Sequence, residues 1–323
     1  MNPIHTALDL SAIFQSDPVV DSLPSGMLSR TTSALDCLRL DKVHPFISGN
    51  KWYKLKHHFN DALKADKRCI LSFGGAYSNH LHALAYAGHC IGIETIGVVR
   101  GEAPETLTPT LQDCERWGMQ IEWMSRRDYR SYATMAAERS LQDRFPQAWI
   151  VPEGGEGRQG VQGVRELFQA LFDAASEPYD YVVCPVGSGT TLAGIVAGSP
   201  GQTHCIGFSV LKNALDLEHR VDRMLDSVEG SHGQWHICHD YHFGGFAKRN
   251  ARLSDFISAV HADYGLLLDP VYTGKALFGL LEWSKQGRLR QDARILLVHT
   301  GGLQGWRGFG DRWPVIGDDE QSF

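Results

Sequence analysis

Short apolar runs alternate with longer segments of helical periodicity along nearly the whole chain, and this alternation restricts the fold more than any other feature. Runs such as Tyr181–Pro185 and Ile295–His299 have the length and composition of buried strands. The pattern predicts an α/β protein with mainly parallel sheets flanked by helices. The other expected strands are Leu35–Leu40, Cys69–Phe73, Thr95–Val99, Gln120–Trp123, Trp149–Val151 and His204–Phe208. The expected helices are Lys51–Lys64, Asn79–His89, Thr108–Gly118, Tyr129–Phe145, Gln159–Phe172, Thr190–Ala197, Ala214–Leu225, Leu253–Ala262, Tyr272–Ser284 and Leu303–Phe309.

Charge and hydropathy exclude several classes of protein. The formal net charge is −6, with 31 basic and 37 acidic residues and no basic arm, so we expect no nucleic-acid partner. The longest apolar stretches are too short to cross a membrane. The opening MNPIHTALDL has neither a basic segment nor a long apolar one, so no secretory signal is visible and we expect a cytoplasmic protein.

Cysteine and histidine spacing gives no sign of a metal or disulfide framework. The seven cysteines are odd in number and include no C-x-x-C pair, which argues against disulfides and a zinc finger. His239 and His242 flank Asp240 and could hold a metal, but a structural or active-site loop is the commoner explanation for such a group. We therefore predict no metal site.

Four expected junctions between a strand and a helix are rich in glycine and small polar residues. They are Phe73–His80, Glu153–Gly163, Val186–Thr191 and His299–Gly302. Each alone could be a tight turn. Because ligands of parallel α/β sheets sit at the carboxyl ends of strands, four such loops on one sheet edge favour a shared ligand that carries a phosphate.

The segment Gly187–Thr191 (GSGTT) is the best candidate for the phosphate loop. It follows a strand and opens a helix, where free backbone N–H groups and the helix dipole attract an anion. It lacks the lysine of a Walker loop. A competing loop, Gly155–Gly160, matches the dinucleotide pattern G-x-G-x-x-G, but Glu156 would repel a pyrophosphate and the next strand ends without an acid for the ribose. A nicotinamide dehydrogenase is therefore a weaker alternative.

Lys51 begins an expected helix that also contains Lys54 and Lys56. Such a cluster is usually a solvated basic face. Lys51, however, lies in the first turn, where the helix-start amides disfavour a protonated amine and lower its pKa. A neutral amine is what Schiff-base chemistry requires.

Five segments, SGNKWYKLK, GAYSNH, GSGTTLAG, LLLDPVYTGKA and ILLVHTGG, resemble the fold-type-II pyridoxal-phosphate family of D-cysteine desulfhydrases and 1-aminocyclopropane-1-carboxylate deaminases, which is related to the β subunit of tryptophan synthase. The resemblance extends from about Leu38 to Gly302. It implies a homodimer of two-domain subunits with the cofactor between the domains, and we expect a large domain of residues 1–50 and 160–323 and a small domain of residues 51–159.

The resemblance also implies roles for individual residues. Lys51 matches the Schiff-base lysine, Asn79 the asparagine that hydrogen-bonds the phenolic oxygen of the cofactor, and Tyr272 a catalytic tyrosine that faces the substrate. Thr300, with Thr273 nearby, matches a neutral hydroxyl partner of the pyridine nitrogen. The expected cofactor contacts are completed by Asn50, Gly187, Ser188, Gly189, Thr190 and Thr191, and the expected substrate contacts are Tyr77, Ser78 (also as a catalytic residue), Asn79, His80 and Phe246.

Two positions favour the desulfhydrase branch. The deaminase branch resembles DPVYEGK and HLGG, where this chain has Thr273 and Thr300. A hydroxyl partner leaves the pyridine nitrogen largely neutral, which suits elimination with little carbanion build-up. The predicted reaction is α,β-elimination from a small amino acid, best D-cysteine to pyruvate, sulfide and ammonia, in which the amine of Lys51 removes the α-proton.

One departure from the family leaves alternatives open. Phe246 stands where the family has a tyrosine, so a step that needs that phenol would require Tyr241, His242 or Tyr77 instead; Tyr77 itself replaces a usual glutamine. The remaining alternatives are 1-aminocyclopropane-1-carboxylate deamination and a protein that binds pyridoxal phosphate without turnover.

Overall fold

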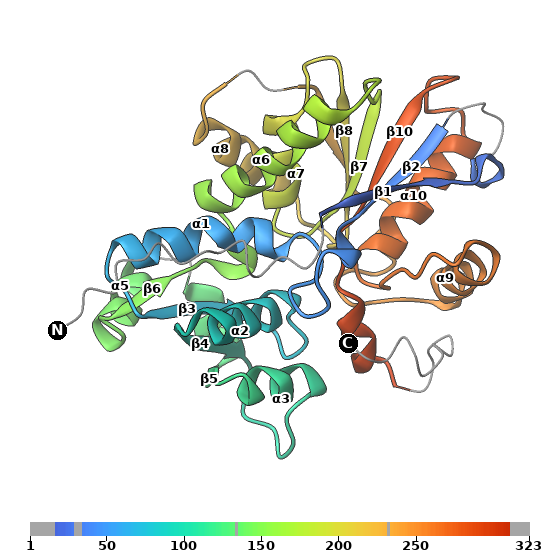
Figure 1. The fold of residues 1–323 in the computed structure, drawn as a ribbon. Coiled ribbons are helices and arrows are strands. Elements are labelled where there is room, and N and C mark those ends of the chain that lie inside the picture. Colours follow the sequence, from blue (N-terminus) through green and yellow to red (C-terminus); the bar gives the residue numbers. More distant parts are fainter. Residues whose placement is uncertain (1–16, 29–33, 133–134, 231–232, 311–323) are drawn as a thin grey trace.

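The computed structural model describes residues 17–28, 34–132, 135–230 and 233–310, and these residues form two sheets (Figure 1). The larger sheet has six strands in the order β1-β2-β10-β7-β8-β9, and only the β1–β2 pair is antiparallel. Its strands are β1 (Val19–Leu23), β2 (Ala34–Arg39), β7 (Tyr181–Val186), β8 (His204–Ser209), β9 (Trp235–Cys238) and β10 (Arg294–His299).

The smaller sheet is formed by residues 69–150. Its four strands are all parallel, in the order β5-β4-β3-β6. They are β3 (Cys69–Gly74), β4 (Glu94–Arg100), β5 (Gln120–Met124) and β6 (Ala148–Ile150). The chain therefore contributes its first two strands to the larger sheet, then forms the whole smaller sheet, and then adds the last four strands to the larger sheet. The expected domain boundaries near residues 50 and 160 are compatible with this order and stay predictions.

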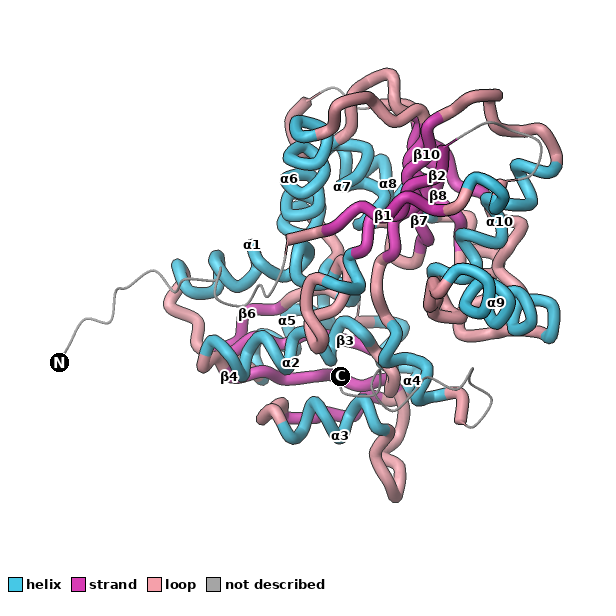
Figure 2. Tube along the Cα trace, turned by 45° about the vertical axis from the view of Figure 1, so that its right-hand side comes forward, coloured by secondary structure: helices cyan, strands magenta, loops and turns pink. Residues whose placement is uncertain are grey.

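Helices cover both sheets, as Figure 2 shows. The α-helices are α1 (Lys51–Lys64), α2 (Asn79–Ile91), α3 (Pro109–Arg116), α4 (Arg126–Ser131), α5 (Met135–Arg144), α6 (Arg158–Ala174), α7 (Thr190–Gly198), α8 (Leu217–Asp226), α9 (Ala251–Tyr264) and α10 (Thr273–Lys285). The 3-10 helices are η2 (Ser25–Met27), η3 (Leu40–Lys42), η4 (Glu153–Gly155) and η5 (Leu303–Gly308).

Helix α1 lies between the two sheets (Figures 1 and 2). Its apolar residues recur at helical spacing, with Trp52, Leu55 and Phe59 in the core against the smaller sheet. Tyr53 points the other way, into the core formed by the larger sheet with α6 and α7. Since α1 belongs to both cores, its first residue, Lys51, is held where they meet.

The parallel pairing of β2 with β10 sets the surroundings of that first residue. His299 is in register with Arg39, so the segments that follow the two strands run side by side. Gly49 N–H donates to Leu40 O (2.9 Å) and Asn50 N–H to Thr300 O (3.3 Å). Lys51 is thereby placed beside the loop after β10.

All eight expected strands are confirmed to within two residues. Two short edge strands, β1 and β9, were not predicted, because an edge strand of four or five partly exposed residues lacks a buried apolar pattern. The single expected helix Tyr129–Phe145 is wrong: the chain forms α4 and then α5. The expected helix Leu303–Phe309 is the 3-10 helix η5.

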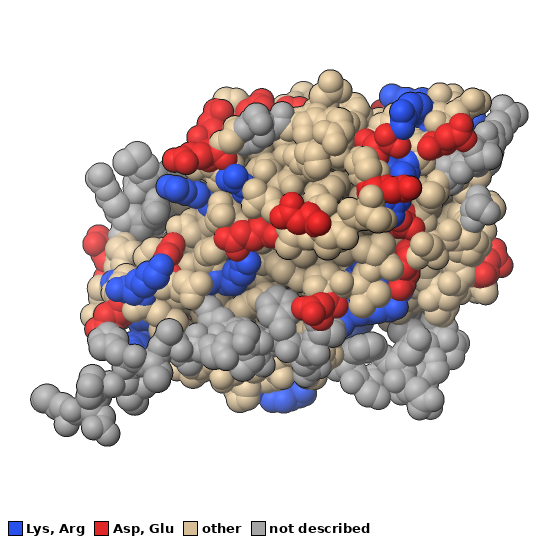
Figure 3. Space-filling view, turned by 45° about the horizontal axis from the view of Figure 1, so that its top comes forward, with Lys and Arg blue, Asp and Glu red and all other residues tan. Residues whose placement is uncertain are grey.

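Two further observations concern the surface. Among the described residues, none of the helices is long and apolar enough to span a membrane. Acidic and basic side chains are interspersed over the face drawn in Figure 3, in agreement with a chain whose charges nearly balance.

Candidate active site

The four glycine-rich loops all lie at the carboxyl ends of strands, two in each sheet. We expected one sheet edge; two of the loops follow β3 and β6, and two follow β7 and β10. A Cβ atom on Gly154 would lie 3.6 Å from Ser188 Oγ, and one on Gly302 would lie 2.7 Å from Asn79 Nδ2. The candidate site is therefore the place where the two sheets face each other.

The amine of Lys51 lies at the centre of these loops. Lys51 Nζ donates to Asn50 Oδ1 (2.5 Å) and lies 5.9 Å from the centre of the Tyr272 ring. Asn50 in turn donates from Nδ2 to Thr191 Oγ1 (2.6 Å), which ties the lysine to the start of α7. Burial lowers the pKa of Lys51 to about 8, although the charge of Asp269 acts in the opposite direction. Burial thus increases the fraction of the amine that is neutral near physiological pH.

Lys54 is a second buried lysine of this site, and its place in the sequence did not predict it. Only 5% of it is exposed, and its Nζ donates to Gly154 O (3.0 Å) and approaches Ser188 Oγ (3.5 Å). Burial lowers its pKa to about 7, and the nearby Lys51 adds to this effect. In the described part of the chain, no carboxylate pairs with it, so this cation lacks an anion.

The segment Gly187–Thr191 lies where Lys54 points. Gly189 adopts a left-handed conformation (φ 91°) just before α7, and Ser188 Oγ lies 3.0 Å from Thr190 Oγ1. Backbone N–H groups at a helix start, two hydroxyls and a buried lysine form a donor set that suits a phosphate. The residues present therefore fit pyridoxal phosphate, with an amine for its aldehyde at Lys51 and donors for its phosphate at Lys54 and the α7 start.

We expect the stability of the cofactor-free protein to rise with pH through the range in which Lys54 titrates. Between about pH 7, its folded pKa, and its ordinary value of 10.5, the unfolded chain holds a proton that the folded chain has released. The free energy of unfolding must then increase with pH. Lys54→Met should remove up to about 2 kcal/mol of the increase between about pH 7 and pH 9.

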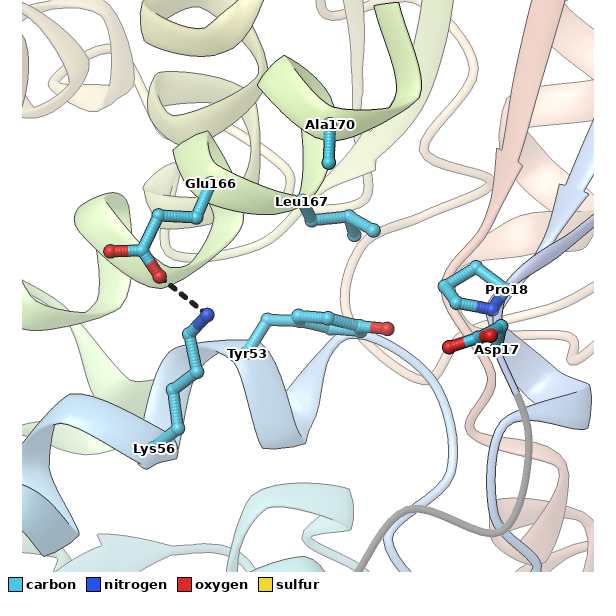
Figure 4. A pocket seen from close by; sticks show the side chains of 7 residues that line it. All are labelled: Asp17, Pro18, Tyr53, Lys56, Glu166, Leu167 and Ala170. Carbon is cyan, nitrogen blue, oxygen red and sulfur yellow. Dashed lines mark ion pairs between the residues drawn. The ribbon is translucent and has the colours of Figure 1, made fainter. Parts of the chain in front are cut away.

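Urea denaturation of wild type and Lys54→Met at the two pH values measures this difference. Part of the rise should survive in the variant, because burial also lowers the pKa of Lys51 and of Lys275 to about 8. Lys56→Met is the matched control, since Lys56 pairs with Glu166 (2.5 Å) beside a pocket outside the site (Figure 4). Equal pH dependence in wild type and Lys54→Met would contradict the assignment of a lowered pKa to Lys54.

Tyr272 is positioned by a turn that Asp269 organises. The Asp269 carboxylate accepts hydrogen bonds from the backbone N–H of Val271 (2.8 Å), Tyr272 (2.7 Å) and Thr273 (2.8 Å). The Thr273 hydroxyl donates to the same carboxylate (2.6 Å) and accepts from Asp269 N–H (3.0 Å). The hydroxyl of Thr273 is therefore engaged within the turn, while its expected contact with the cofactor stays a prediction.

Thr300 offers the other expected hydroxyl. Its backbone carbonyl accepts from Asn50 N–H, and within the described residues its side chain makes no hydrogen bond. Burial also raises the pKa of Tyr272, whose ring centre lies 5.9 Å from Lys51 Nζ, and this keeps the phenol protonated. The hydroxyls around Lys51 are thus neutral groups.

The predicted substrate residues surround the start of α2. Ser78 is the N-cap of the helix, and its Oγ accepts from Leu81 N–H (3.2 Å) while its own proton stays available to donate. His80 is buried, with Nε2 2.7 Å from Ser72 Oγ in β3. Tyr77 is 44% exposed and lies against η5, where a Cβ atom on Gly308 would be 2.9 Å from its ring.

Phe246, which stands where the family has a tyrosine, lies beside Tyr272. The two ring centres are 6.0 Å apart and nearly perpendicular, and Phe246 is 48% exposed. Two of the three proposed substitutes have hydrogen-bond partners elsewhere: Tyr241 Oη accepts from Gln286 (3.4 Å), and His242 Nδ1 accepts from Gly244 N–H (2.9 Å). An exposed apolar ring, without a phenol, thus borders the site.

Two groups that the sequence left open have partners within the protein. Glu156 forms an ion pair with Arg220, and a Cβ atom on Gly160 would lie only 2.0 Å from Gly155 O, so this glycine-rich loop is explained by packing and pairing. His239 is engaged by Glu218 (2.7 Å), and in the described ranges no group of three His, Cys, Asp or Glu residues is arranged to hold a metal.

Comparison with known proteins agrees with this geometry. The model of the family described as pyridoxal-phosphate dependent enzyme matches residues 27–301. The chain belongs to this family. The enzyme is a pyridoxal-phosphate-dependent lyase or deaminase with the fold-type-II architecture, as the sequence predicted, and its cofactor is pyridoxal phosphate.

Individual relatives indicate which branch of the family the enzyme resembles. A protein of Pyrococcus abyssi, provisionally named 1-aminocyclopropane-1-carboxylate deaminase, is 30% identical over 82% of this enzyme and 83% of its own length. A D-cysteine desulfhydrase of Salmonella choleraesuis is 25% identical over 82% and 86%. A solved structure described as an ACC deaminase homologue superposes with a TM-score of 0.79 and 25% identity, covering 97% of this enzyme and 98% of that chain. The enzyme therefore belongs among the deaminases and desulfhydrases of the family.

Proposed function

We propose that the enzyme eliminates the β-substituent of a small amino acid, with D-cysteine as the favoured substrate, giving pyruvate, sulfide and ammonia. The observation that supports elimination most is the amine of Lys51, whose pKa of about 8 and lack of a carboxylate partner among the described residues suit a base. A homodimeric state and a cytoplasmic location stay predictions.

The residues around Lys51 divide the work of binding and proton transfer. Bound pyridoxal phosphate supplies the electron sink next to the substrate's α-carbon. Lys51 would hold the cofactor at its aldehyde, and the same amine, once an incoming amino acid has freed it, would take the α-proton. Lys54 and the loop Gly187–Thr191 hold its phosphate, whereas Ser78 and the first amides of α2 hold the substrate carboxylate.

We favour D-cysteine because the groups available to the pyridine nitrogen of the cofactor are neutral. Thr300 and Thr273 are hydroxyl residues, and the one carboxylate of this turn, Asp269, accepts four hydrogen bonds from its own turn. A site without a free carboxylate for the pyridine nitrogen favours elimination over chemistry that builds up a full carbanion.

Ring opening of 1-aminocyclopropane-1-carboxylate to 2-oxobutanoate is the second candidate. The name given to the Pyrococcus abyssi relative favours it. Phe246 favours a third candidate, a protein that binds the cofactor without turnover, because phenylalanine cannot transfer a proton.

A substrate panel separates the three candidates. The holoenzyme is incubated with D-cysteine, L-cysteine, D-serine, β-chloro-D-alanine and 1-aminocyclopropane-1-carboxylate, and sulfide, ammonia and keto acids are measured. We expect sulfide and pyruvate from D-cysteine. Release of 2-oxobutanoate alone would establish the deaminase, and no ammonia from any compound would establish the protein without turnover.

A further inference from the structure

We propose that Gln304 is a positioning residue that fixes the orientation of the Asn79 amide, so that its NH2 group and not its oxygen faces the site. Asn79 opens α2 at the carboxyl end of β3, and Gln304 lies in η5 after β10. Gln304 Nε2 donates to Asn79 Oδ1 across the space between the two sheets. The inference rests on the proposed function only in assuming that Asn79 meets the cofactor.

The orientation follows from the donors that surround Gln304. Arg307 Nη2 donates to Gln304 Oε1 (3.1 Å), and Thr110 Oγ1 donates to the same oxygen (2.7 Å). A guanidinium has donors only, so the atom of Gln304 that faces Arg307 must be the oxygen. The other end of the amide is then an NH2 group, which also has donors only. Asn79 must meet it with Oδ1, and the Asn79 NH2 group is left facing the other way.

The far side of the Asn79 amide has room for a ligand group because residue 302 is glycine. Gly302 has φ 89°, and a Cβ atom there would lie 2.7 Å from Asn79 Nδ2. Gly302 is in the loop after β10, and the same loop also contacts Gly49 through Thr300 and Gly301. A donor is therefore presented beside the loops that surround Lys51.

An ion pair holds Arg307 in the position from which it orients Gln304. Arg307 Nη1 pairs with Asp113 Oδ2 (2.6 Å) in α3, and His82 Nε2 lies 3.4 Å from the same carboxylate oxygen. Burial alone would raise the pKa of Asp113, but the hydrogen bonds from His82 and Arg307 lower it to about 2. The carboxylate is therefore charged near neutral pH, and the linked side chains of Asp113, Arg307, Gln304 and Asn79 have one arrangement of donors.

The substitution Gln304→Glu replaces the donor that faces Asn79 by an acceptor, while the side chain keeps nearly the same shape. One oxygen of the new carboxylate still accepts from Arg307 and Thr110. The other can only accept, so Asn79 must turn its NH2 group toward residue 304 and present Oδ1 to the site. An acceptor would then face the phenolic oxygen of the cofactor. That oxygen would keep its proton, and binding would weaken.

The experiment compares cofactor binding in the absence of any amino acid. Apoenzyme is titrated with pyridoxal phosphate, and the dissociation constant and the visible band of the bound cofactor are recorded for wild type, Gln304→Glu, Gln304→Met and Thr110→Val. For Gln304→Glu we expect roughly a tenfold to hundredfold weaker affinity, the cost of a lost hydrogen bond to a charged group, and a band at shorter wavelength. Asn79→Asp, which also presents an acceptor, should reproduce the band shift.

Thr110→Val is the matched control. It removes one donor to Gln304 but leaves Arg307 to set the orientation, so affinity and band should stay close to those of wild type. Gln304→Met, which frees the Asn79 amide without inverting it, should bind the cofactor a few-fold more weakly and serves if Gln304→Glu does not fold.

The possible outcomes separate this inference from the proposed function. Wild-type affinity and an unshifted band in Gln304→Glu, or in Gln304→Met if the former is unfolded, would overturn the role of Gln304. An equal loss in Thr110→Val and Gln304→Glu would also overturn it, because a general loosening of η5 would explain both. Neither result would affect the proposed function, which fails instead if the wild-type enzyme acquires no visible band on Lys51.

Discussion

Lys51→Ala is expected to lose turnover by a factor of about 10²–10⁴ or more, because the residue serves as both covalent anchor and base. The loss should be the same for every substrate that the panel identifies. Borohydride reduction of the wild-type holoenzyme should add the mass of the reduced cofactor to the peptide that contains Lys51. The same treatment should leave Lys51→Ala without that increment.

Lys54 and Lys56, on the same helix, make this test specific. Lys56→Ala removes the ion pair between Lys56 and Glu166, whose side chains are 23% and 36% exposed. Such a solvent-accessible ion pair contributes little to stability. The variant should trap the cofactor and turn over like wild type. Near-normal turnover in Lys51→Ala, or trapping on Lys54 in the wild-type enzyme, would refute the assignment of the anchor to Lys51.

Gly49→Ala is expected to destabilise the protein by about 3 kcal/mol or more and to abolish cofactor binding. Gly49 has φ 78°, and its Cβ atom would lie 1.8 Å from Thr300 O and 2.8 Å from Gly301 Cα. All of these atoms belong to the backbone, so no side chain can move aside. The chain must unfold in part, or the segment that carries Lys51 must move away from the loop after β10.

Gly92→Ala is the matched control, because it introduces the same backbone strain as Gly49→Ala without a steric clash. Gly92 has nearly the same conformation (φ 74°), yet nothing lies within 4 Å of the position of its Cβ atom. It should lose only the cost of a left-handed residue, about 1–2 kcal/mol, and bind the cofactor normally. Thermal or urea denaturation with a cofactor titration measures both effects, and equal stability of the two variants would contradict the close approach of Gly49 to Thr300.

The sequence was informative about the fold wherever a periodic pattern coincided with burial. Strands such as β7 and β10 are buried on both faces, so their apolar runs are continuous. The edge strand β1 has mostly exposed side chains and no such run. The expected helix Tyr129–Phe145 was wrong because helical spacing alone does not show where a helix ends.

The sequence predicted those parts of the candidate site that lie in glycine-rich loops or in short segments with a recognisable order of residues. Lys51, Asn79, Tyr272 and the loop Gly187–Thr191 do come together, which supports their proposed roles. Lys54 was missed because a lysine one turn into a helix has the pattern of a solvated face, and only the folded chain shows Gly154 and Ser188 around it. Gln304 was missed for the same reason, since its partners Asn79 and Thr110 are some two hundred residues away in sequence.

The position of β10 has a consequence for biosynthesis. This strand is the last of the ten in the described chain, yet it is inserted between β2 and β7 in the interior of the larger sheet. Until the ribosome has released it, both neighbours expose unpaired edges, and the loop that carries Thr300 and Gly302 does not exist. The smaller sheet can assemble early on the nascent polypeptide, whereas the candidate active site is completed only after β10 and the loop that follows it have been synthesised.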